Sequence, residues 1–108
     1  MLLLTAVAMP AWAHDVITTK ITWAREISRL FERHCMNCHQ AGGKAPFALT
    51  TWEQARPWAV AIREEVTMRR MPPWSAVKGF GDFRDDPSLT QEQIQLIADW
   101  VNGGAPEG

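Results

Sequence analysis

The two cysteines of this chain lie close together, in the pentapeptide Cys35-Met36-Asn37-Cys38-His39. The C-x-x-C-H spacing is typical of covalent c-type haem attachment, because two thiols can add across the two vinyl groups on one porphyrin edge. The histidine that follows directly is placed to bind the iron through its imidazole. Cys35, Cys38 and His39 are therefore predicted to bind one haem c, with His39 as the proximal iron ligand.

Two other kinds of site use cysteines at this spacing, and both remain alternatives. A thioredoxin-like redox pair requires a βαβ pattern, whereas the sequence has no convincing alternating strand pattern. A structural zinc site requires four ligands, and Cys35, Cys38 and His39 have no credible partner pair at suitable spacing.

The ligand on the other side of the iron decides the function. A methionine or histidine there makes an electron carrier, and an open position makes a catalyst or a gas-binding protein. Met68 and Met71 are separated by one helical turn, so both are candidates to face the haem. We favour Met71, because Pro72-Pro73 stiffen the segment that would present its sulfur. Met68 is the alternative distal ligand. Either methionine could instead only pack in the core, which is the ordinary role of a methionine. A further alternative is a bis-histidine site, in which His14 would be the distal ligand.

Further groups are expected to support the haem. The loop around Ala45-Pro46 is placed to offer a carbonyl oxygen to the Nδ1–H of His39. His34 is tethered too closely to Cys35 to reach the distal face, and we expect it to be exposed or hydrogen-bonded near the haem edge. Candidate partners for the haem propionates are Arg69, Arg70 and Lys44. The tryptophans predicted to line the core and the haem are Trp23, Trp52, Trp58, Trp74 and Trp100.

Apolar spacing predicts helices that position these groups. The first helix is predicted from Trp23 to about Cys38, with the haem motif at its C-terminal end. A capping box at Thr50-x-x-Glu53 is predicted to open a second helical segment. A third helix is predicted from Trp58 to about Arg70, since the following Pro72-Pro73 stops it, and 75–88 is expected to form a surface loop.

The last predicted helix has the clearest boundaries. Thr90 is its expected N-cap and Gln93 the partner in a capping box, while Leu89 and Ile94 form a hydrophobic staple. The sequence Asn102-Gly103-Gly104 then ends the helix.

Composition bounds the class of protein. The 108 residues are enough for one small domain, with 46% hydrophobic residues and a formal net charge of −1. Basic and acidic residues alternate without a basic run, which excludes an extended nucleic-acid-binding surface. Residues 1–13 carry no charge and end in Ala-Trp-Ala, so they are predicted to be a signal peptide, truncated at its start because a basic region is missing. An uncleaved membrane anchor is the alternative, although the apolar run is shorter than a span requires.

The chain resembles the class I c-type cytochromes. The resemblance rests on Cys35 to His39, on Met71 and on the helix from Thr90 to Asn102. The run through Ala45-Pro46-Phe47 to Met71-Pro72-Pro73-Trp74 is also similar to a bacterial subgroup of small monohaem domains. The resemblance implies an all-α, cytochrome c-like fold over residues 14–108, in which the N- and C-terminal helices pack across each other around one covalent haem. It also implies export to the periplasm.

These observations together predict a periplasmic electron-transfer protein that carries one electron on haem c with His/Met ligation. We expect weak, transient complexes with redox proteins, a monomeric state, no nucleic-acid partner, and membrane association only through partner complexes. The alternative is a haem domain or subunit of a larger oxidoreductase, associated with a peroxidase or monooxygenase. Catalysis at the iron would require a distal acid–base group, and no histidine is well placed for that role.

Overall fold

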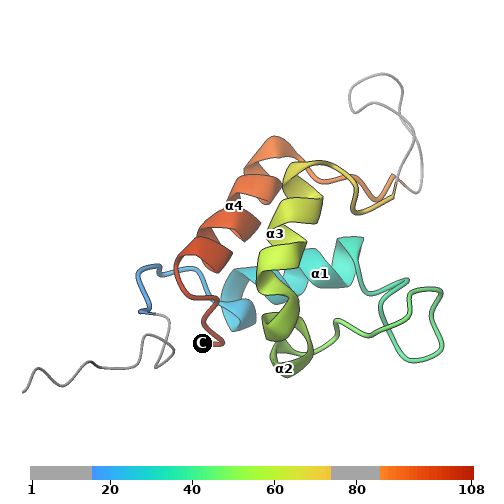
Figure 1. The fold of residues 1–108 in the computed structure, drawn as a ribbon, viewed down its shortest axis with the longest axis horizontal. Helices are drawn as coiled ribbons and strands as arrows, with labels where there is room; N and C mark the ends of the chain where they lie inside the picture. The colour runs from blue at the N-terminus through green and yellow to red at the C-terminus, as the bar shows by residue number, and fades with distance from the viewer. Residues whose placement is uncertain (1–15, 74–85) are drawn as a thin grey trace, which may run out of the picture.

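The computed structural model describes residues 16–73 and 86–108, and these residues are helical without a strand. The elements follow in the order η1 (Trp23–Ile27), α1 (Ser28–His34), α2 (Trp52–Ala55), η2 (Arg56–Trp58), α3 (Ala59–Thr67) and α4 (Gln91–Asn102). In Figure 1, α3 and α4 lie beside each other and α1 runs behind α3, while η1 contacts α4. This arrangement confirms the predicted all-α architecture.

The first helix begins where the sequence predicts and ends earlier. Thr22 caps it, because its hydroxyl oxygen accepts the N–H of Arg25. The first turn is a π-helix, and the helix then continues as α1 to His34. The N–H of Cys35 still donates to the carbonyl oxygen of Phe31, four residues back, but the N–H of Met36 donates to the same oxygen, five residues back. The α-helical hydrogen-bond pattern therefore ends at Cys35. The prediction of a helix to about Cys38 is therefore wrong by one turn.

The middle helices also differ from the prediction in their boundaries. The capping box is formed by Thr51 and Gln54, one residue later than the predicted pair Thr50 and Glu53. Gln54 Oε1 accepts hydrogen bonds from the N–H groups of both Thr50 and Thr51. The amide oxygen of Gln54 thus has the acceptor role that was predicted for the carboxylate of Glu53. α3 ends at Thr67, three residues before the predicted end.

The last helix confirms the sequence analysis. Thr90 is the N-cap of α4 and forms a reciprocal capping box with Gln93. Leu89 and Ile94, the two members of the predicted staple, are both buried. Burial of both side chains agrees with the predicted staple, a contact that sets the direction in which a chain enters a helix.

An aromatic core joins the two ends of the chain. The ring centroid of Trp23 lies 5.0 Å from that of Phe31 and 6.1 Å from that of Trp100, and all three side chains are buried. Trp100 Nε1 donates to the carbonyl oxygen of Pro106, and the N–H of Trp23 donates to the same oxygen. The N- and C-terminal helices therefore pack across each other, as predicted.

Some predictions fall outside the described residues. These are the signal peptide, His14, Trp74 and most of the surface loop predicted for 75–88. Within the described residues, no helix is both long and apolar enough to cross a membrane.

Candidate functional site

The C-x-x-C-H sequence forms a compact turn directly after α1. The N–H of Cys38 and the N–H of His39 both donate to the carbonyl oxygen of Cys35, at 3.2 and 3.0 Å. Both cysteines are free thiols and partly exposed. The turn therefore holds two unpaired sulfur atoms and one imidazole within a single hydrogen-bonded unit.

The surroundings of Cys35 are apolar. Burial, with a smaller effect from Cys38, raises the pKa of the Cys35 thiol to about 12. Burial acts in this direction because an apolar environment disfavours the charged thiolate. Near neutral pH this sulfur is a neutral, hydrophobic group, which suits contact with an apolar partner.

The ring of His39 is held by one hydrogen bond. Its Nδ1 lies 3.1 Å from the carbonyl oxygen of Phe47. A carbonyl oxygen can only accept, so Nδ1 is the donor, and in the neutral imidazole Nε2 then keeps a lone pair for a metal. The predicted acceptor was the loop around Ala45-Pro46, and the carbonyl belongs to the next residue. The N–H of Leu49 donates back to the carbonyl oxygen of His39 at 2.9 Å, so the loop is bound to His39 at two points.

An aromatic stack supports the same imidazole. The ring of Phe47 lies 4.7 Å from that of His39, tilted by 53°. Trp58 then stacks on Phe47 at 4.3 Å with an interplanar angle of 12°, while 44% of its surface stays exposed. Trp58 was predicted to be a haem-wall residue, whereas Phe47 was not predicted to contact His39. The run Ala45-Pro46-Phe47, which contributes to the family resemblance, is the sequence signal that could have identified it.

A glycine allows this loop to close against the haem motif. A Cβ atom at Gly43 would lie 2.3 Å from the carbonyl oxygen of Cys38, which is far inside van der Waals contact. Gly42 has a φ of +77°, a left-handed conformation that residues with a Cβ rarely adopt. The two glycines are thus required for different reasons.

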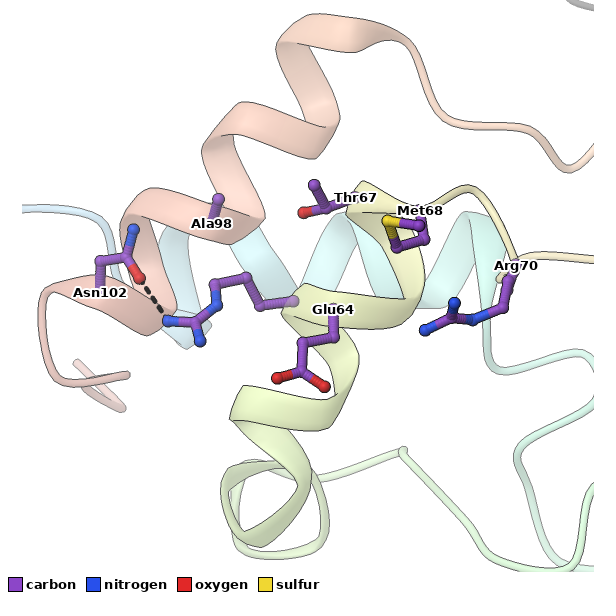
Figure 2. A pocket seen from close by; sticks show the side chains of 7 residues that line it. Glu64, Thr67, Met68, Arg70, Ala98 and Asn102 are labelled. Carbon is purple, nitrogen blue, oxygen red and sulfur yellow. Dashed lines mark hydrogen bonds between the residues drawn. The ribbon is translucent and has the colours of Figure 1, made fainter.

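The two candidate distal ligands lie in different places. Met68 caps α3 and lines an open groove of about 540 Å³ between α3 and α4, shown in Figure 2. The groove is lined from α3 by Arg63, Glu64 and Thr67 and from α4 by Ala98 and Asn102. Met71 is 41% exposed and lies beyond the helix. The prediction that one helical turn relates Met68 to Met71 is wrong, because α3 ends at Thr67.

The segment that carries Met71 and the loop that carries the C-x-x-C-H turn leave the helices on the same side of the molecule (Figure 1). The N–H groups of Arg70 and Met71 both donate to the carbonyl oxygen of Glu65, at 2.9 and 3.3 Å. The start of this segment is therefore bound to the last turns of α3.

Three of the four polar side chains considered near the site form hydrogen bonds within the protein. Arg70 forms two hydrogen bonds with the carboxylate of Glu65, at 3.0 and 3.1 Å. Arg69 donates to the carbonyl oxygen of Leu89, and Lys44 is exposed. His34 is partly buried, and its Nδ1 lies 2.8 Å from the carbonyl oxygen of Pro87, in agreement with the prediction that it is hydrogen-bonded.

The comparisons with known proteins bear on this arrangement. A family model described as cytochrome C oxidase, cbb3-type, subunit III matches residues 22–101. The chain belongs to this family. It is thus a c-type cytochrome domain whose cofactor is covalent haem c and whose chemistry is haem-based electron transfer. The comparisons with curated proteins and with solved structures find no match.

The residues of this cytochrome fit such a group. Two unpaired thiols lie in one turn with an imidazole whose Nε2 is available to iron. Among residues 16–73 and 86–108, no cluster of three or more His, Cys, Asp or Glu side chains is placed to hold a metal ion. A haem iron requires only one such side chain, because the porphyrin supplies four nitrogen ligands.

Proposed function

We propose that this chain is a periplasmic one-electron carrier, in which Cys35 and Cys38 bind haem covalently and His39 and Met71 are the axial ligands of its iron. The observation that carries the proposal is the hydrogen bond from His39 Nδ1 to the carbonyl oxygen of Phe47. This bond fixes the tautomer and the orientation of the imidazole within the same turn that presents both thiols.

The bound haem would supply the one-electron couple between ferric and ferrous iron. The chain's own contribution is a site that changes little between the two states. His39 is held by the Phe47 carbonyl and by the Phe47–Trp58 stack, so its ring does not need to reorient when the charge of the site changes. A methionine sulfur on the other side favours the ferrous state and raises the reduction potential.

The structure supports Met71 over Met68 as the distal ligand. Met68 belongs to the groove between α3 and α4 (Figure 2). Met71 lies in the segment that leaves the helices on the same side as the haem motif (Figure 1). Exposure does not distinguish the two, because Met68 is 64% exposed and Met71 is 41% exposed. The preference for Met71 therefore rests on the position of its segment.

We further propose that residues 1–13 direct export and that the mature domain comprises residues 14–108. The uncharged start ending in Ala-Trp-Ala supports this reading. Weak contacts with redox proteins and a monomeric state fit an electron carrier. The second candidate is a haem-bearing subunit of a larger oxidase, and the description of the matched family favours it.

The ligand set is tested by the absorption spectrum of the exported holoprotein. With a methionine sulfur on the iron, the ferric protein should be low-spin and show the weak near-infrared sulfur-to-iron band. Met71→Ala should remove this band, and Met68→Ala, the matched control three residues earlier in the chain, should keep it. The opposite pattern would assign Met68, and a high-spin ferric spectrum of the unsubstituted protein would reject the carrier proposal.

The two candidate functions differ in what the protein binds. A carrier should elute as a monomer in size-exclusion chromatography and reduce or oxidise soluble partners in short encounters. An oxidase subunit should copurify from detergent-solubilised membranes with other haem-bearing chains, in a fixed ratio. Stable copurification would replace the first candidate by the second without changing the ligand assignment.

A further inference from the structure

Two residues of a short segment before α4, Pro87 and Leu89, accept hydrogen bonds from two distant parts of the chain. His34 Nδ1 donates to the carbonyl oxygen of Pro87 at 2.8 Å. Arg69 Nη1 donates to the carbonyl oxygen of Leu89 at 3.0 Å. We refer to Pro87-Ser88-Leu89 as the bridging tripeptide.

Each of the two donors is close in sequence to one of the two segments that carry the proposed iron ligands. His34 is the last residue of α1 and directly precedes Cys35, the first residue of the haem motif. Arg69 lies two residues before Met71. In Figure 1 the end of α1, the segment after α3 and the segment before α4 come together on one side of the molecule. The bridging tripeptide therefore connects the segment that carries the proximal ligand with the segment that carries the distal one.

Arg69 has a backbone conformation that needs support. Its φ is +56°, in the left-handed region that residues with a Cβ adopt at an energetic cost. Its N–H donates to the carbonyl oxygen of Val66 at 3.1 Å, so the chain reverses direction here and leaves α3. Strained residues of this kind persist when surrounding contacts hold them, and the bond from the Arg69 guanidinium to Leu89 is such a contact.

The tripeptide itself is firmly anchored. Leu89 is 2% exposed and belongs to the same buried core as Ile94. The next residue, Thr90, is the N-cap of α4 in a complete capping box. Since α4 packs on the aromatic core through Trp100, a side chain bound to Leu89 is bound to a segment anchored on that core.

We propose that His34 and Arg69 are positioning residues, which fix the spacing between the two ligand-bearing segments through the bridging tripeptide and so keep the Met71 sulfur on the iron. This inference rests on the proposed function, because it takes Met71 as the distal ligand. Without the bond to Leu89, the segment after α3 would swing away more often. An added small ligand would then replace the sulfur more rapidly.

The test measures how fast excess imidazole displaces the sulfur ligand from the ferric holoprotein, followed by loss of the sulfur-to-iron band. Arg69→Gln should accelerate displacement about tenfold, the factor expected when a hydrogen bond from a charged donor is lost. Arg69→Gly should accelerate it similarly, although glycine accepts the left-handed conformation without strain. Arg29→Gln, the matched control on an exposed face of α1, should leave the rate unchanged.

The His34 side of the bridge has its own conservative variant. The Nε2 of His34 is buried without a hydrogen-bond partner, so only Nδ1 carries the contact to Pro87. His34→Asn keeps a donor near the position of Nδ1 and should keep the original rate, whereas His34→Ala should accelerate displacement. Equal rates in His34→Asn and His34→Ala would overturn this half of the proposal.

The outcomes separate this inference from the proposed function. A band in the unsubstituted protein with an unchanged displacement rate in Arg69→Gln overturns the bridge and leaves Met71 as ligand. An Arg69→Gly rate equal to that of the unsubstituted protein shows that only the backbone conformation matters, and also overturns it. If the unsubstituted protein has no band, the ligand assignment fails and the bridge fails with it. A purely structural role would lower the denaturation midpoint without changing the displacement rate.

Discussion

Substitution of Gly43 should disturb the loop that holds His39. A Cβ atom at this position would lie 2.3 Å from the carbonyl oxygen of Cys38, and real Cβ atoms essentially never come closer than 3.0 Å to another heavy atom. The loop would therefore have to retreat by at least about 0.7 Å. This movement would break two hydrogen bonds of the loop. The N–H of Gly43 donates to the carbonyl oxygen of Gln40 at 2.9 Å, and the N–H of Ala45 donates to that of Cys38 at 3.0 Å. Losing both, at about 1 kcal/mol each, predicts that Gly43→Ala lowers the free energy of unfolding by about 2 kcal/mol.

The neighbouring glycine provides the control for this prediction. Nothing lies within 4 Å of a Cβ built at Gly42, so Gly42→Ala should cost only the left-handed conformation, about 1 kcal/mol. Gly42→Asn should cost less, because asparagine tolerates that conformation. The free energies are measured by guanidinium denaturation of the ferric holoprotein. The reasoning is refuted if Gly43→Ala is no more destabilising than Gly42→Ala, since the clash with Cys38 would then have no consequence.

Two further predictions concern the surface around the site. Trp58→Ala should lower the free energy of unfolding by about 2 kcal/mol, because it removes the half-buried ring stacked on Phe47. Trp58→Phe should retain most of this stability in thermal denaturation, and equal losses in the two variants would argue against the stack. The hydrogen bonds from Arg70 lower the pKa of the Glu65 carboxyl. Its contribution to stability is therefore present above the ordinary glutamate pKa of 4.5 and is lost as the pH falls below it. Arg70→Gln should flatten this acid limb of the stability profile at low salt, and an unchanged limb would show that the pair contributes nothing.

The local parts of the site could be predicted from the sequence because their chemistry is contained in a few consecutive residues. Cys35 to His39 form one turn whose hydrogen bonds run within the motif itself. The cap at Thr90 with Gln93 is similarly local, and the structure confirms it. The other capping box is displaced by one residue, since Thr50 and Thr51 are equally good caps by residue type and only the start of helix α2 at Trp52 distinguishes them.

The contacts that orient the site could not be predicted because they join distant positions. The stack of Phe47 on Trp58 and the bond from Arg69 to Leu89 span loops whose path no periodicity encodes. The end of α3 was also misplaced. Arg69 and Arg70 are good helix formers by residue type, but Arg69 adopts a left-handed conformation that tertiary contacts stabilise.

Main-chain carbonyl oxygens accept most of the side-chain hydrogen bonds that hold the site together. In these bonds the side chain of the first residue donates to the carbonyl oxygen of the second: His39 to Phe47, His34 to Pro87, Arg69 to Leu89, Trp52 to Ala105 and Trp100 to Pro106. Every residue type has a carbonyl oxygen, so these bonds depend on the length of each loop more than on its side chains.

This dependence on loop length can be tested at Ala48, which lies between Phe47 and Leu49, the two residues bound to His39. Ala48→Ser keeps both bonds possible and should leave a single low-spin ferric species in the electron paramagnetic resonance spectrum. Deletion of Ala48 prevents the Phe47 carbonyl and the Leu49 N–H from reaching His39 together, because one residue of extended chain spans about 3.3 Å. The imidazole would then adopt several orientations, and the spectrum should show more than one low-spin species. A single species in the deletion variant, identical to that of the unsubstituted protein, would mean that the loop does not orient His39.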